Sequence, residues 1–209
     1  MRKTGLKSSS TKILASVVLV AGAASVAGMG TFGAFTSTTS ASESVATGKV
    51  EIGLTQNAAL GTTVPANNLV PGDTVQRAVT LTRSSETEAF GSVKLTTAGS
   101  TANLLTSDVS NGLQMAIDQC TGGSWTQVGT TKALECTGGG TVTSVVAAGP
   151  VVQTNTDLAV AKEALNAAGA KSELRITLTL PDAAGNTFQG LSNAITFTFD
   201  ATQRAAQAK

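Results

Sequence analysis

The sequence contains no histidine and no tyrosine, and it has a single tryptophan. A protease of the zincin type needs two imidazoles one helical turn apart, and a Ser-His-Asp triad needs one imidazole as its general base. Neither site can be built from these 209 residues. A Ser-Lys site requires a serine beside a desolvated lysine, and no motif in the sequence predicts one. We therefore expect no catalytic residues and no enzymatic activity.

Charged residues are also scarce, at 13% of the chain, about half the usual share. Many Thr and Val with only four prolines are typical of a Thr-rich β protein rather than a charged disordered chain. No acidic residue precedes Glu43, whereas beyond residue 33 ten basic residues face thirteen acidic ones. That remainder has no basic stripe, so we expect no nucleic-acid partner.

The chain begins with a basic segment followed by an apolar one. Residues 1–12 are polar and basic, and residues 13–30 read ILASVVLVAGAASVAGMG. This order is typical of a secretory signal peptide. Eighteen residues also reach the minimum length of a transmembrane helix, but the Gly/Ala-rich second half and the lack of a following basic cluster favour the signal. We expect an exported protein that contacts the membrane only through the uncleaved signal.

Two sites fit the small-x-small rule for signal cleavage. Ser25-Val26-Ala27 predicts a cut after Ala27, and Thr31-Phe32-Gly33 predicts a cut after Gly33. Local rules do not choose between them.

Alternating apolar and polar residues predict several strands. Their apolar positions are Val50, Ile52 and Leu54; Val75, Val79 and Leu81; Val93 and Leu95; Leu174, Ile176, Leu178 and Leu180; and Ile195, Phe197 and Phe199. Strands joined by Gly-rich turns, without a βαβ rhythm, indicate an all-β antiparallel sandwich. Residues 157–168 have a helical composition, with Thr156 or Asp157 as the cap and Gly169 as the end, so we expect one short connecting helix.

Cys120 and Cys136 are the only cysteines. In an exported chain an even pair predicts a disulfide. A zinc site built on two thiols without histidine, or a thiol nucleophile without its imidazole base, is a weaker alternative. We predict a structural disulfide and no metal site.

Two further motifs resemble a phosphate-binding loop and a calcium-binding loop, but each lacks residues that such a site needs. The run CTGGGT at residues 136–141 lacks the lysine and the strand-to-helix context of a phosphate-binding loop. Asp182 and Asn186 lack the alternating ligands and the final Glu of a calcium loop. We therefore expect no cofactor.

Four stretches together resemble the TasA/camelysin family of secreted Gram-positive surface proteins. They are GTFGAFTSTTSASESVATGKVEIGLT (30–55), NLVPGDTVQRAVTLT (68–82), LRITLTLP (174–181) and AITFTFDATQ (194–203). The resemblance covers both ends of the chain and is weak from about residue 98 to residue 170. It implies a jelly-roll form of the sandwich and a signal removed by a dedicated signal peptidase after Gly33, with Ala34 as the mature N-terminus.

The resemblance also implies a function. Family members assemble by donating an N-terminal strand, so we expect residues 34–46, with Ala34, Phe35 and Val45, to form an assembly arm. A disordered leader is the alternative for this segment. The expected organisation is a signal peptide at 1–33, the arm, a β-sandwich at 47–200 and a polar tail at 201–209. The expected protein is a self-associating, fibre-forming structural protein of the cell surface or biofilm matrix. A camelysin-type metallopeptidase and a wall-polymer or partner binding module are the alternatives.

Overall fold

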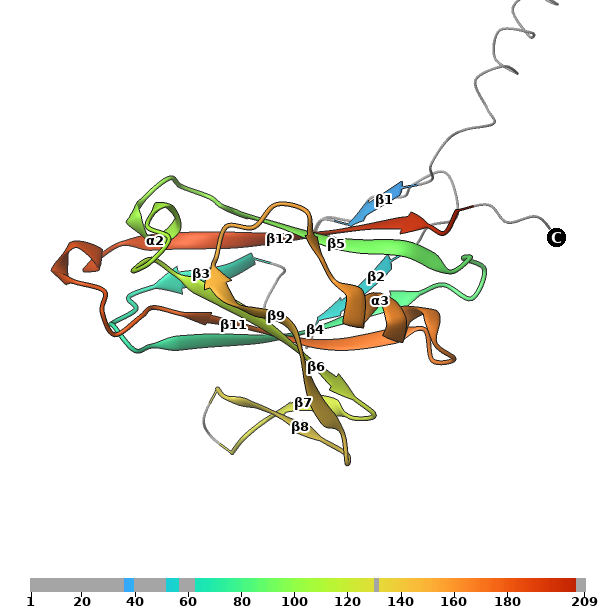
Figure 1. The fold of residues 1–209 in the computed structure, drawn as a ribbon. Coiled ribbons are helices and arrows are strands. Elements are labelled where there is room, and N and C mark those ends of the chain that lie inside the picture. The colour runs from blue at the N-terminus through green and yellow to red at the C-terminus, as the bar shows by residue number, and fades with distance from the viewer. Residues whose placement is uncertain (1–35, 40–51, 57–62, 130–131, 206–209) are drawn as a thin grey trace, which may run out of the picture. The chain divides into compact units, whose positions relative to one another are not determined.

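The structure is a computed structural model that describes residues 36–39, 52–56, 63–129 and 132–205, with side chains described from Ala66 onward. In this part of the chain two antiparallel sheets face each other across a hydrophobic core, and a two-stranded hairpin forms a third sheet (Figure 1). The predicted all-β antiparallel sandwich is confirmed. Among the described residues, no helix combines the length and the apolar character needed to cross a membrane.

The first sheet is built around β12 (Ser192–Gln203). β5 (Phe90–Gly99) pairs along one edge of β12, and β10 (Thr156–Asp157) pairs with β5. Along the other edge, β3 (Thr63–Asn67) pairs with the first half of β12 and β1 (Thr36–Thr39) with the second half. Both are antiparallel to β12, so β1 and β3 lie end to end along the same edge.

The second sheet has β4 and β11 at its centre. Its strand order is β2 (Ile52–Gln56), β4 (Thr74–Arg83), β11 (Lys171–Thr179), β6 (Gln114–Thr121) and β9 (Thr141–Pro150). β11 pairs with β4 from Thr74 to Thr82, whereas β2 pairs with β4 only from Val79 to Arg83. The two edges of β4 are therefore covered to different extents by the described strands.

The predicted alternation builds the core between the two sheets. Leu174, Ile176 and Leu178 of β11 are buried, while the residues between them are partly exposed. Phe197 and Phe199 of β12 are buried in the same cluster. Burying one such side chain contributes about 1.5–3 kcal/mol, so the period-two pattern is the main determinant of which face of each sheet turns inward.

The predicted connecting helix is present as α3 (Ala159–Asn166), but its predicted caps are wrong. Its N-cap is Leu158, which gives no side-chain cap, because Thr156 and Asp157 are paired with β5 as β10. The helix ends at Asn166, three residues before Gly169. The side-chain amide of Asn166 accepts from the Phe90 N–H at 2.8 Å and donates to the Phe90 carbonyl at 2.9 Å. The sheet therefore fixes both ends of this helix.

Two shorter helices also connect strands, α2 (Leu104–Ser107) and the 3-10 turn η1 (Asn186–Phe188). A turn forms at Pro71-Gly72-Asp73, with Gly72 at φ 89°. A Cβ at Gly72 would lie 2.6 Å from Oδ1 of Asp182. Glycine suits this position because its φ is positive, and a larger residue would also displace the Asp182 carboxylate.

β12 continues to Gln203, beyond the point where we expected the polar tail to begin. Ala201 is fully buried and lies opposite Val93, and Thr202 lies opposite Ser92. Ala201 therefore continues the inward-facing series of Phe197 and Phe199, and the strand extends past its last phenylalanine.

Candidate functional site

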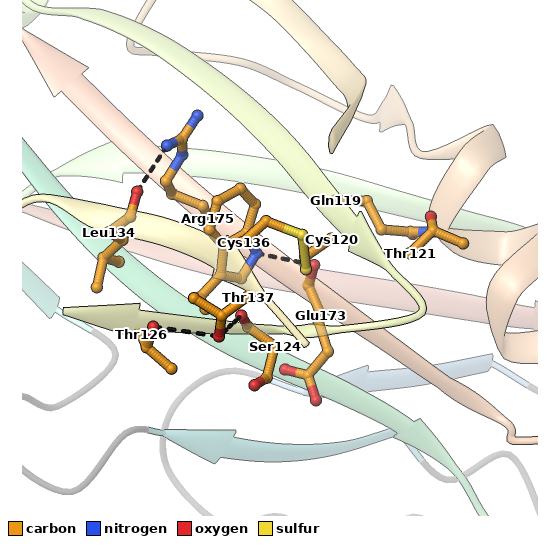
Figure 2. Close-up of a disulfide and its surroundings, with 11 residues drawn as sticks. Gln119, Cys120, Thr121, Ser124, Thr126, Leu134, Cys136, Thr137, Glu173 and Arg175 are labelled. Carbon is orange, nitrogen blue, oxygen red and sulfur yellow. Dashed lines mark hydrogen bonds between the residues drawn. A yellow bond between two sulfur atoms is a disulfide. The ribbon is translucent and has the colours of Figure 1, made fainter. Parts of the chain in front are cut away.

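The two cysteines are bonded to each other, which confirms the predicted disulfide. Cys120 lies at the end of β6, and Cys136 lies in β8 (Leu134–Thr137) with a Cα–Cα distance of 5.5 Å (Figure 2). β8 pairs with β7 (Ser124–Gln127) to form the small third sheet. The bond therefore ties this hairpin to the second sheet of the sandwich.

Glycines allow the backbone to approach the disulfide closely. A Cβ at Gly140 would lie 2.7 Å from the sulfur of Cys136 and 2.8 Å from that of Cys120. A Cβ at Gly123 would lie 2.0 Å from the Thr137 carbonyl oxygen. The Gly-rich run after Cys136 is thus partly a packing requirement, in addition to being a loop.

The hairpin also packs on the sheet through Trp125, which is only 3% exposed. The indole Nε1–H donates to the Glu173 carbonyl at 3.0 Å, and the Arg175 guanidinium carbon lies 4.4 Å from the ring centroid. Arg175 also donates to the Leu134 carbonyl at 2.9 Å (Figure 2) and to the Asp118 carboxylate at 2.6 Å. The single tryptophan is thus buried between the hairpin and the second sheet.

Polar side chains near this hairpin hydrogen-bond to one another, whereas the Arg175 Nε is buried and has no hydrogen-bond partner. The Ser172 hydroxyl donates to the Gln119 amide oxygen at 2.7 Å, and the Gln119 amide nitrogen donates to the Thr121 hydroxyl at 3.1 Å. The Glu173 carboxylate accepts from the Thr80 hydroxyl at 2.7 Å and pairs with Lys171 at 2.6 Å. This arrangement stabilises the sheet and places no base beside the serine.

The predicted assembly arm is described only in part. Gly33, Ala34, Phe35 and Val45, and with them the predicted cleavage site, lie outside the described residues. The part that is described, Thr36–Thr39, is strand β1 on the edge of β12. The arm thus contains a segment that pairs with a sheet edge, here in the same chain.

The sequence provided little indication of the environments of two arginines, Arg175 and Arg77. Arg175 sits at a polar position of its strand, so the alternation places it on the outer face, but nothing in the sequence predicted its partners Asp118 and Trp125. Arg77 occupies a position of β4 whose parity is otherwise apolar, between Val75 and Val79. This charged residue at an otherwise apolar position was the feature of the sequence that could have indicated a partly buried arginine.

Comparison with known proteins identifies a family but no individual relative. Residues 8–208 match the family described as camelysin metallo-endopeptidase. The comparisons with curated proteins and with solved structures gave no match. Because the match extends over almost the whole chain, including the central region in which the sequence motifs were weak, this chain belongs to the camelysin family.

Proposed function

We propose that this protein is a secreted structural component of the cell surface or extracellular matrix that self-associates through its N-terminal segment. The observation that carries the proposal is the pairing of Thr36–Thr39 with Phe199–Thr202 on β12. This segment lies just after the proposed new N-terminus at Ala34. Processing would therefore release the end of the chain that contains an edge strand.

The pairing of β1 suits exchange between copies. The strand has only four residues, and it shares the edge of β12 with β3. A short edge strand is held mainly by its ladder of backbone hydrogen bonds. The same segment of a second copy can form the same ladder, and repeated head-to-tail donation of this kind produces a filament.

The experiment compares protein that begins at Ala34 with protein that begins at Thr47. We expect the longer form to assemble, as measured by light scattering and electron microscopy, and the shorter form to stay monomeric. Equal behaviour of the two forms across concentration and pH would contradict an assembly role. N-terminal sequencing of the secreted protein is expected to begin at Ala34, whereas a start at Gly28 would place the cut after Ala27.

The family description supports a second candidate, a secreted metallo-endopeptidase. The donor set of this chain does not fit a protease metal. The sequence has no histidine, both cysteines are in the disulfide, and the described residues contain no group of three or more Cys, Asp or Glu side chains that could hold an ion. Casein cleavage that copurifies with the protein and is abolished by a chelator would favour this candidate.

A further inference from the structure

A hollow of about 440 Å³ lies beside the first residues of β4. Its lining comprises Asn67, Thr74, Val75, Gln76, Arg77, Lys132 and Ala133. Four of these residues are consecutive in β4. Since β11 covers one edge of β4 along this stretch, consecutive residues can line a hollow only along the opposite edge. That is the edge to which β2 pairs only from Val79 onward.

Arg77 lines the hollow, and the Nε of its guanidinium has almost no accessible surface. Nη1 donates to the Gln76 carbonyl at 2.7 Å, whereas Nε is buried and has no hydrogen-bond partner. Within the described part of the chain Arg77 forms no ion pair with a carboxylate. A buried donor without a partner carries its full desolvation cost, and burial lowers the pKa of Arg77. Arg77 is thus a partly desolvated cation that has no counter-ion among the residues with described side chains.

The other lining groups add positive charge and donors. Lys132 is exposed and has no ion pair among the residues with described side chains. The Gln76 amide oxygen already accepts from the Leu134 N–H at 2.7 Å, so its amide nitrogen is the group it still offers. No Asp or Glu is among the described lining residues. The hollow therefore favours an anion.

We propose that this hollow binds a carboxylate through the Arg77 guanidinium, with the Lys132 ammonium as the second cation. A guanidinium offers pairs of parallel N–H groups that match the two oxygens of a planar carboxylate. The carboxylate can belong to a small molecule or to an acidic side chain of a polypeptide. This site is separate from β1 and does not depend on the assembly proposed above.

The test uses the secreted protein labelled with ¹⁵N, at constant ionic strength. The Arg Nε–H signals are followed by NMR during titration with sodium acetate, a blocked Ala-Glu-Ala peptide, its Ala-Gln-Ala counterpart and inorganic phosphate. Arg77→Met assigns the Arg77 signal. We expect acetate and the Glu peptide to shift this signal saturably and the Gln peptide to leave it unchanged. Tighter binding of the Glu peptide than of acetate indicates a polypeptide ligand, and equal affinity indicates a small one.

Lys132→Gln and Lys94→Gln form a matched pair, because both lysines are exposed and Lys94 lies on β5, away from the hollow. Loss of one charge-assisted contact should weaken acetate binding about tenfold in Lys132→Gln and leave it unchanged in Lys94→Gln. Urea unfolding should show Arg77→Met at least as stable as the parent, since it removes a desolvated cation. An unshifted Arg77 signal, equal losses in both lysine variants, or tighter binding of phosphate than of acetate would overturn the proposal.

Discussion

The Arg175 guanidinium links Trp125 and Asp118: its carbon lies 4.4 Å from the Trp125 ring centroid, and its Nη2 lies 2.6 Å from Oδ2 of Asp118. The three residues belong to β11, β7 and β6. A single side chain therefore connects the hairpin to two neighbouring strands of the sandwich. Together with the disulfide, it holds the hairpin against the second sheet.

Replacing Arg175 with Met should destabilise the fold. The Arg175 and Asp118 side chains are 21% and 20% exposed, so the pair lies between an exposed ion pair and a buried one, and removing the cation leaves the carboxylate unpaired. We expect a loss of about 1–3 kcal/mol in the free energy of unfolding, measured with urea. Asp118→Asn together with Arg175→Met should cost less than the two single losses added. Strict additivity would show that the two side chains are not coupled.

Removing the disulfide should loosen the hairpin and lower global stability. The cysteines are 16 positions apart, and closing a loop of this size contributes about 3 kcal/mol in the chain-entropy model. The expected result is a loss of that order in the Cys120→Ser/Cys136→Ser double variant, and the same loss in the parent protein under reducing conditions. The Trp125 fluorescence should report exposure of the indole. Two titratable thiols in the native secreted protein would contradict the bond.

Acid should weaken the turn that follows α2. The N–H groups of Asn111 and Ser110 donate to the Asp108 carboxylate at 2.9 and 3.0 Å, and they hold the pKa of Asp108 below its usual value. The lowered pKa means that the stabilising contribution is complete above the usual pKa of about 4 and is lost as the pH falls through the folded-state value. Thermal unfolding between pH 5 and pH 2 should therefore depend more steeply on pH in the parent than in Asp108→Asn.

Glu163→Gln provides the control for this experiment, because Glu163 is an exposed carboxylate whose side chain has no hydrogen bond among the described residues. It should keep the pH dependence of the parent below pH 4. If Glu163→Gln and Asp108→Asn flatten the profile equally, the effect comes from overall charge rather than from the Asp108 turn.

The sequence predicted those strands in which the alternation is uninterrupted. β11 and β12 each place apolar side chains at every second position over most of their length. Such a pattern fixes the inward face without further information. The disulfide was also predictable, because the expectation of export favours oxidised cysteines and two cysteines offer a single pairing.

The sequence analysis missed β6 and β9, in the middle of the chain, because their apolar patterns are interrupted. In β6, Gln119 occupies an inward buried position and is satisfied by Ser172, a residue distant in sequence. The register of β6 against β9 shifts on both sides of Ile117, with the extra residues in β9, so the alternation of β9 is interrupted. β9 is an edge strand and largely exposed, so burial imposes no apolar face on it. The hollow beside Arg77 depends on which strands pair with β4 and over which residues. A local sequence pattern does not specify this pairing.

A pair of proline substitutions in β1 tests whether its backbone ladder carries assembly. Successive residues of a strand direct their N–H groups to opposite sides, so only one of Ser37 and Thr38 donates to β12. Proline removes the N–H. In protein that begins at Ala34, we therefore expect one of Ser37→Pro and Thr38→Pro to abolish assembly in electron microscopy while the other retains much more of it. Hydrogen exchange of the β12 amides from Phe199 to Thr202 should increase most in the same variant. If both variants assemble like the parent, the segment 36–39 does not form the contact between copies, and if both fail alike, the loss reflects the rigidity of proline rather than the ladder.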